Sequence, residues 1–121
     1  MVQRIFLADD DLNVRQALRL LLEQAGFTIA GEAIDAQGMF TQVSNSPPDI
    51  ILIDWELPGM KAKDLLSELR RCCPETKIIA LSVRTEAQPI ALSVGVDAFA
   101  SKGNPSDELL AILHSLDDKD M

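Results

Sequence analysis

The chain contains 121 residues, with 19 acidic and 11 basic side chains and a formal net charge of −8. This length suits one domain with a sizeable core, and the negative charge argues against direct binding of this domain to a nucleic-acid backbone. Cys72 and Cys73 are adjacent, which suits disulfide geometry poorly, so we expect reduced thiols near a helix end. The apolar run at the N-terminus is too short to span a membrane, and acidic residues follow it at once, so we expect a soluble, cytoplasmic protein.

The first predicted elements are a strand and a helix. Residues 4–8 form an apolar run that ends on three consecutive aspartates. Apolar residues then recur at three- and four-residue spacing as far as Ala25, which predicts a helix. Either Asp11 or Asn13 would cap the start of this helix, and Gly26 would end it.

The next strand is expected over residues 27–33, and Asp35 caps a weak helix after it. Residues 50–53 are four consecutive aliphatics, a pattern typical of a parallel strand buried on both faces. This strand ends on Asp54, and Pro58-Gly59 turns the chain away. Asp54 is therefore expected at the edge where open α/β sheets bind ligands, although such a residue, taken alone, could equally well cap the following turn.

A third helix is predicted before Pro74, and a fourth strand over residues 77–81, which stops on Ser82. The helix that follows is expected to be short and mobile, because Pro89 is tolerated only in a first turn.

A fifth strand is predicted over residues 96–100, just before Lys102. The last helix has the clearest signals, with Asn104 as its cap and Pro105 at its first position, and residues 117–121 are expected to form a charged tail, like the start of a linker. Five strands alternating with five helices predict a doubly wound α/β domain, in which helices cover both faces of a five-stranded parallel sheet.

Polar side chains follow four of the predicted strands. Because the carboxyl ends of parallel strands share one edge, these side chains should converge there: Asp9, Asp10, Asp54, Ser82 and Lys102. Three carboxylates so close repel one another unless a cation lies among them, and an all-oxygen cluster suits Mg²⁺. With a lysine ammonium and a hydroxyl beside them, these are the groups that phosphoryl transfer requires.

At these residues the chain resembles the receiver domain of two-component response regulators, over essentially its whole length, residues 1–121. The shared motifs are the acidic pair, the acid with a Pro-Gly downstream, the hydroxyl, an aromatic on the fifth strand (Phe99) and the lysine after it. The resemblance implies a flavodoxin-like fold of the chemotaxis-regulator type, with strand order 2-1-3-4-5.

The resemblance also implies a role for each site residue. Asp54 would accept a phosphoryl group from a sensor histidine kinase or a phosphotransfer protein, and Lys102 and Ser82 would contact the phosphoryl oxygens. The groups that would hold Mg²⁺ are the side chains of Asp9, Asp10 and Asp54 and the backbone carbonyl of Glu56.

Ser82 and Phe99 would then form a switch that changes the face made by the fourth helix, the fifth strand and the fifth helix. Partner binding or homodimer formation would use that face. Such a domain is a signalling module and not an enzyme, beyond catalysing its own phosphoryl transfer and autodephosphorylation. It could be the N-terminal receiver of a larger transcriptional regulator, and it would itself contact neither nucleic acid nor membrane.

Two departures from the family pattern flank the site. Gly103 stands where many members have a cis proline, so we expect a trans bond after Lys102. Val83 stands where most members have a small residue. We expect Val83, Glu56 and Arg84 to restrict the water that attacks the phosphoryl group, with Glu56 and Arg84 paired across the mouth of the site.

Two alternatives stand beside this hypothesis. A degenerate receiver that acts as a phosphorylation-independent interaction module would be favoured by loss of an acidic or lysine position, and all of these are intact. A small phosphatase with an aspartyl nucleophile would need a cap domain or a substrate pocket, for which the sequence has no signal. Taken singly, each site residue also has an ordinary role as a cap, a turn former or a core side chain, and only their coincidence favours a site.

Overall fold

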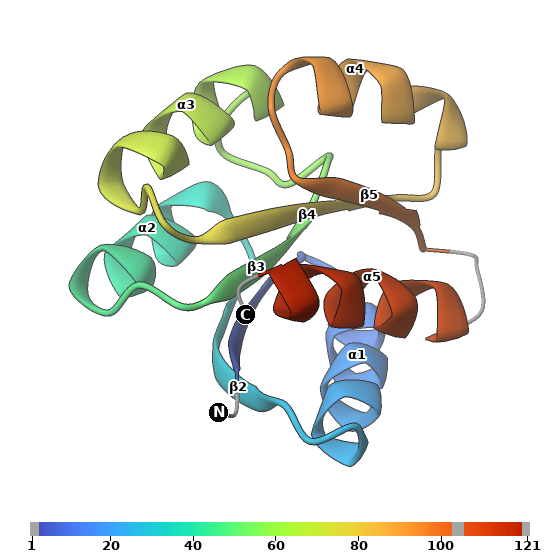
Figure 1. Cartoon of the computed structure of the whole chain (residues 1–121). Helices are drawn as coiled ribbons and strands as arrows, with labels where there is room; N and C mark the ends of the chain where they lie inside the picture. Colours follow the sequence, from blue (N-terminus) through green and yellow to red (C-terminus); the bar gives the residue numbers. More distant parts are fainter. Residues whose placement is uncertain (1–2, 103–105, 120–121) are drawn as a thin grey trace.

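The computed structural model describes residues 3–102 and 106–119, and it contains a five-stranded sheet in the order β2-β1-β3-β4-β5 (Figure 1). All four neighbouring pairs of strands are parallel. The predicted doubly wound fold and its strand order are therefore confirmed. The predicted helix start at Asn104 and Pro105, and the peptide bond between Lys102 and Gly103, lie outside the described residues.

The first half of the chain forms β1 (Arg4–Ala8), α1 (Leu12–Gln24), β2 (Thr28–Ala33), α2 (Ala36–Asn45) and β3 (Ile50–Asp54). Of the two candidate caps of α1, the structure selects Asp11, whose carboxylate accepts the backbone N–H of Asn13 at 2.9 Å. Gly26 follows the helix with a φ of 95°, a left-handed conformation that favours glycine and ends the helix. Asp35 caps α2 as predicted, by accepting the backbone N–H of Gly38.

The second half forms α3 (Ala62–Cys72), β4 (Lys77–Ser82), the 3-10 turn η1 (Thr85–Ala87), α4 (Gln88–Ser93), β5 (Ala98–Ser101) and α5 (Ser106–Lys119). As the sequence predicted, α4 is short, and Pro89 lies at its start.

Two predicted boundaries are wrong by two or more residues. The fifth strand begins at Ala98 instead of residue 96, because the carboxylate of Asp97 accepts the backbone N–H of Ile78 at 2.8 Å, so a side chain completes the pairing with β4 there. The expected charged tail from residue 117 instead continues α5 to Lys119. Leu113 and Leu116 are buried, and their packing holds the last part of this helix against the sheet.

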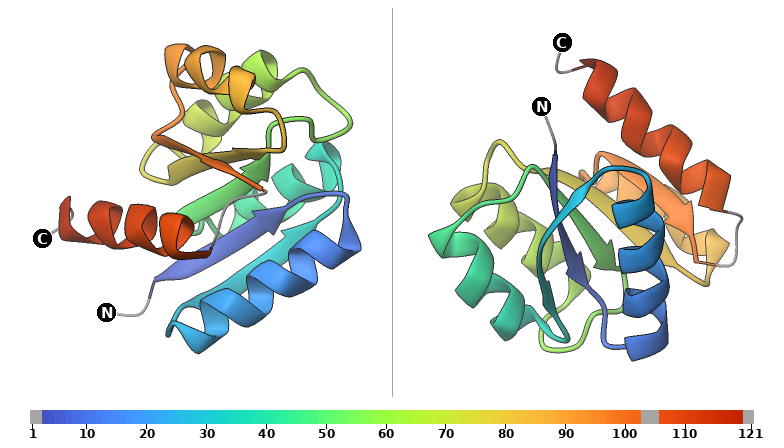
Figure 2. Two further views of the ribbon diagram at one scale, coloured as in Figure 1. Left: turned by 90° about the vertical axis from the view of Figure 1, so that its right-hand side faces the viewer. Right: turned by 90° about the horizontal axis from the view of Figure 1, so that it is seen from below.

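The core consists of two apolar layers, one on each face of the sheet. Figures 1 and 2 show α1 and α5 on one face and α2, α3 and α4 on the other. In β3, Ile51 and Ile53 belong to the layer under α2 and α3, whereas Ile50 and Leu52 belong to the layer under α1 and α5. The strand is buried along its whole length, as expected for a central parallel strand, and this burial fixes the position of Asp54 at its end.

In the part of the chain that the structure describes, no helix is both long and apolar enough to cross a membrane.

Candidate functional site

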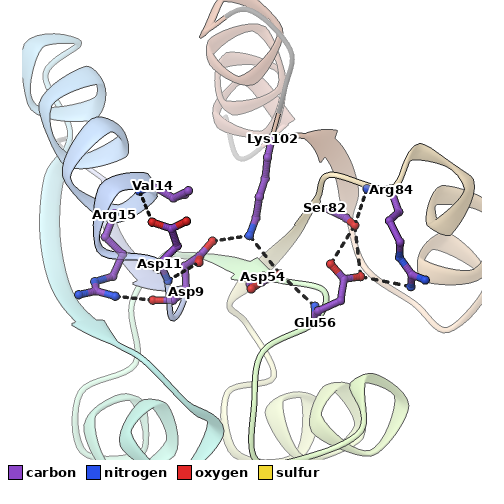
Figure 3. A network of polar contacts seen from close by, with 9 residues as sticks. All are labelled: Asp9, Asp11, Val14, Arg15, Asp54, Glu56, Ser82, Arg84 and Lys102. Atoms are coloured by element: carbon purple, nitrogen blue, oxygen red, sulfur yellow. Dashed lines mark hydrogen bonds and ion pairs between the residues drawn. The ribbon is translucent and has the colours of Figure 1, made fainter.

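The carboxyl ends of β1, β3, β4 and β5 bring the predicted polar residues to one edge of the sheet (Figure 3). Asp9 and Asp54 are only 1% and 5% exposed, and Ser82 is completely buried, whereas Asp10 is exposed. Charged and hydroxyl groups are rarely buried in this way without partners, so the partners of these side chains define what the site can do.

Lys102 joins the two buried aspartates. It lies just beyond β5, and its backbone N–H donates to the carbonyl of Ser82 at 2.9 Å. Its Nζ lies 2.7 Å from Oδ2 of Asp9 and 3.2 Å from Oδ1 of Asp54. One ammonium therefore bridges carboxylates that come from the first and third strands.

The three aspartates form a compact cluster of oxygens. Each of Asp9, Asp10 and Asp54 offers one carboxylate oxygen that lies within 4.8 Å of the others. Oδ1 of Asp9 accepts the backbone N–H of Asp11 at 2.9 Å. Oδ2 of Asp9 is buried, and its neighbour is the ammonium of Lys102 at 2.7 Å. A buried carboxylate oxygen with free accepting capacity, beside an exposed carboxylate, fits a hard cation such as Mg²⁺ that keeps several of its waters.

The site shifts the pKa of its two central groups. Burial raises the pKa of Asp54 above its usual value. The backbone N–H of Glu56 and the charge of Lys102 oppose this rise, whereas the charge of the Asp9 carboxylate adds to it. Burial alone would lower the pKa of Lys102, but its hydrogen bond to Asp9 and the charges of Asp54 and Asp9 outweigh this effect, so the pKa of Lys102 is raised. The lysine therefore stays charged at neutral pH.

The backbone after β3 is held against the site. The backbone N–H of Trp55 donates to the carbonyl of Leu81 at 2.8 Å, which continues the pairing with β4 beyond the end of β3. The backbone N–H of Glu56 donates to Oδ1 of Asp54 at 3.0 Å. The peptide of Glu56, whose carbonyl is a predicted metal ligand, therefore lies next to the Asp54 carboxylate.

A second cluster contains Ser82, Glu56 and Arg84. Oγ of Ser82 donates to the Glu56 carboxylate, at 3.0 Å from Oε1, and accepts the backbone N–H of Arg84 at 3.0 Å. Nη2 of Arg84 lies 3.4 Å from Oε2 of Glu56, so the predicted pair across the mouth is present. The bond between Ser82 and Glu56 was not predicted. The sequence does give a signal for this bond, because Ser82 is at the end of one predicted strand and Glu56 comes two residues after the end of another.

The remaining predicted residues differ in exposure. Val83, which lies between Ser82 and Arg84 in the chain, is 71% exposed. Phe99 is buried in the layer that also contains Ala87 and Ala91 of the η1 and α4 region. Val83 is thus accessible to solvent, whereas a rotation of Phe99 would have to displace core neighbours.

Sequence reasoning missed a supporting arginine on α1. Nη1 of Arg15 donates to the backbone carbonyl of Asp9 at 2.6 Å, and its Nε donates to Oε1 of Glu32 at 3.1 Å. Glu32 also pairs with Arg19, one helical turn further along. The spacing of Arg15 and Arg19 on one helix face is visible in the sequence, but their common partner on β2 is known only once the strand is placed.

The fold and the site together define a doubly wound α/β domain in which one lysine bridges two buried aspartates at an acidic edge of the sheet. The family model of the response regulator receiver domain matches residues 5–114, so the chain belongs to this family of two-component signal transduction. Receiver domains act with histidine kinases as signalling modules and are generally not enzymes.

Known relatives differ in their length. The nitrate/nitrite response regulator protein NarL of Escherichia coli K12 is 30% identical over 113 residues, which cover 91% of this chain and 52% of NarL. The chemotaxis protein CheY of Thermotoga maritima is 28% identical over 104 residues, which cover 84% of this chain and 87% of CheY. The chain spans about half the length of the curated relatives that it matches at 30% identity or more.

Solved structures agree with the fold. The crystal structure of a CheY-like response regulator receiver domain protein from Methanospirillum hungatei JF-1 has a TM-score of 0.83 and 28% sequence identity. The similarity covers 99% of this chain and 98% of that one. The whole architecture is therefore shared with a receiver domain that matches this chain from end to end.

Proposed function

We propose that this receiver domain is a phosphorylation-controlled switch in which Asp54 accepts a phosphoryl group from a phosphohistidine of a sensor histidine kinase or a phosphotransfer protein. The observation that carries this proposal is the Lys102 ammonium, 2.7 Å from Asp9 and 3.2 Å from Asp54, beside a third carboxylate at the carboxyl edge of the sheet. A carboxylate nucleophile and fixed positive charge are the parts that phosphoryl transfer needs.

In this transfer, a carboxylate oxygen of Asp54 forms the new O–P bond while the N–P bond of the phosphohistidine breaks. Lys102 would hold a phosphoryl oxygen, and the distance of 3.2 Å between its Nζ and Oδ1 of Asp54 supports this role. Mg²⁺ would be held by Asp9, Asp10, Asp54 and the backbone carbonyl of Glu56, and when bound it supplies positive charge that offsets the negative charge of the phosphoryl oxygens. The burial of Asp54 excludes water and strengthens these charge interactions.

The conformational change that carries the signal would begin at Ser82. To contact a phosphoryl oxygen, its hydroxyl must leave the carboxylate of Glu56, and the end of β4 would move toward Asp54. Phe99, which is already buried in the layer of Ala87 and Ala91, would then change its rotamer among these neighbours and re-form the face made by α4, β5 and α5. The six-residue α4 offers few internal hydrogen bonds to resist this change.

Partners would bind at that re-formed face. We propose that a second copy of the chain, or an output domain or protein, contacts α4, β5 and α5 after phosphorylation. PhoB of Escherichia coli K12, of which this chain matches 50%, is named a phosphate regulon transcriptional regulatory protein. A role as the receiver of a longer transcriptional regulator is consistent with that match and forms part of the proposal.

The direct test is incubation with acetyl phosphate and Mg²⁺, read by intact mass. We expect one added phosphoryl group on the wild-type chain and none on Asp54→Asn. Asp64→Asn is the matched control, because Asp64 is an exposed aspartate in the first turn of α3, and it should be phosphorylated like wild type. An unmodified wild type, with its fold intact by circular dichroism, would reject the proposal and favour the phosphorylation-independent interaction module.

A further inference from the structure

The two cysteines of the chain lie away from the phosphorylation site. Cys72 is the last residue of α3, and Cys73 is the residue that follows its end. They line a groove with Pro48 and Thr76, near the amino ends of β3 and β4, whereas Asp54 lies at the carboxyl end of β3. The groove has a volume of about 290 Å³, enough for a small ligand.

The two sulfurs face each other. Sγ of Cys72 lies 3.3 Å from Sγ of Cys73, and both cysteines are free thiols. Cys72 is partly exposed, whereas Cys73 is buried and donates to the carbonyl of Val43 at 3.6 Å. This separation is a non-bonded contact of two thiols. Adjacent residues have Cα atoms about 3.8 Å apart, closer than disulfides usually span, so the pair is poorly suited to a disulfide, but it can hold a bridging atom.

The separation of the sulfurs selects the kind of atom that could bridge them. For an atom about 2.3 Å from each sulfur, the length of a Zn–S bond, the 3.3 Å separation gives an S–atom–S angle of about 90°. This angle is narrower than the tetrahedral angle that zinc adopts, and it suits the pyramidal geometry of trivalent arsenic bonded to two thiolates. Zinc would also need further ligands, and within residues 3–102 and 106–119 the pair belongs to no group of three or more potential metal ligands.

We propose that Cys72 and Cys73 form a dithiol site for trivalent arsenical compounds. In the binding step, an arsenoxide R–As=O forms one As–S bond with each thiol, the two thiol protons join the oxygen, and one water leaves. Arsenic and sulfur keep their oxidation states, so the step needs no oxidant or reductant. The groove beside the pair has room for the third substituent of the arsenic.

The surroundings keep Cys73 available as a thiol. Burial raises the pKa of Cys73 to about 12, with the neighbouring Cys72 adding to the rise. A thiol with so high a pKa is a poor nucleophile toward oxidants, because the thiolate is the reactive form. Thr76, which also lines the groove, donates its hydroxyl to the carbonyl of Pro48 at 2.8 Å and so ties the turn after α3 to the start of β3.

Phenylarsine oxide tests this site directly, because the chain contains two cysteines in all. We expect the folded wild type to take up one phenylarsenic group by native intact mass, to lose both titratable thiols together, and to keep the adduct in excess glutathione, a monothiol. A dithiol such as dithiothreitol should remove it. The adduct should also form on Asp54→Asn, because the site does not depend on phosphorylation.

The single variants Cys72→Ser and Cys73→Ser each leave one sulfur, and we expect at least tenfold weaker retention of the adduct in glutathione. Circular dichroism checks that each variant folds, and Cys72→Ser, at the partly exposed position, decides the question if the buried Cys73→Ser does not fold. The proposal is overturned if the wild type binds the arsenical only in denaturant, or if glutathione strips it from the wild type as readily as from Cys72→Ser.

Discussion

Ser82 donates its hydroxyl to the carboxylate of Glu56 at 3.0 Å (Figure 3). We propose that Ser82 contacts the phosphoryl group. Its hydroxyl is therefore held by the residue two positions beyond the proposed phosphoacceptor, Asp54. Ser82 is completely buried, whereas the side chain of Glu56 is 40% exposed and also meets Arg84. In the proposed switch, activation breaks this bond, so Glu56 would stabilise the unphosphorylated arrangement of β4.

Removal of this contact should make activation easier. A hydrogen bond to a charged group contributes about 1.5–3 kcal/mol when shielded, and partial exposure of Glu56 reduces this to roughly 1 kcal/mol. We therefore predict that Glu56→Ala reaches the active state at about fivefold lower concentrations of beryllofluoride, a phosphoryl mimic, as followed by Trp55 fluorescence. Glu68→Ala, which removes an exposed partner of Arg71, should change nothing.

The same contact can be isolated with a double variant. In a Ser82→Ala background, Glu56→Ala should have no further effect on the beryllofluoride midpoint, because the bond is already lost. If Glu56→Ala shifts the midpoint equally in both backgrounds, the contact does not restrain activation.

The lifetime of the phosphoryl group on Asp54 should depend on Val83. This β-branched side chain is 71% exposed and follows Ser82 directly in the chain, and we propose that it obstructs the attacking water. We predict that Val83→Ala lowers the barrier by about 0.5 kcal/mol, roughly a twofold faster loss of phosphate measured by intact mass. Arg84→Ala should have a smaller effect that fades with salt, because its pair with Glu56 is exposed. An unchanged decay in Val83→Ala would exclude this gating role.

Asp54→Asn should stabilise the fold at neutral pH in the absence of Mg²⁺. The pKa of Asp54 is raised in the folded state, chiefly by burial, so the ionised carboxylate costs stability above that pKa. The amide removes this cost, and Lys102 keeps Asp9 as its partner. We predict a gain of roughly 1 kcal/mol, the common scale of a single substitution, measured by urea unfolding in EDTA.

The pH dependence checks the sign of this effect. As the pH falls through the raised pKa of Asp54 toward the ordinary carboxyl value, the wild type binds a proton in the folded state and recovers the lost stability. The difference between wild type and Asp54→Asn should therefore shrink on acidification and vanish below the ordinary carboxyl pKa. A difference that grows on acidification would show that the carboxylate is stabilising in the folded state.

Arg15 should act as a positioning residue for Mg²⁺. Its side chain is 12% exposed and holds the carbonyl of Asp9 at 2.6 Å. We predict that Arg15→Met weakens Mg²⁺ binding about tenfold, the usual cost of losing a group that orients a ligand, in titrations followed by Trp55 fluorescence. Arg71→Met, at an exposed ion pair on α3, is the control and should bind Mg²⁺ like wild type. A loss of thermal stability in Arg15→Met with unchanged Mg²⁺ affinity would show that Arg15 only supports the fold.

The sequence alone determined the order of elements and the edge at which the site forms. The strand at residues 50–54 consists of four apolar residues followed by an aspartate. Such a local pattern is typical of a buried parallel strand and can be recognised before the fold is known. Once the strands are parallel, their carboxyl ends share an edge, so the meeting of Asp9, Asp54 and Lys102 followed from spacing along the chain.

Only the tertiary structure decided which partner each of these groups takes. The bridge from Lys102 to both aspartates, the bond from Ser82 to Glu56 and the contact of Arg15 with the Asp9 carbonyl join residues from different elements. Such contacts depend on strand register and on side-chain conformations, which local periodicity does not encode. The end of α5 was missed for a related reason: the buried contacts of Leu113 and Leu116 carry the helix into a charged segment that looks like a linker in isolation.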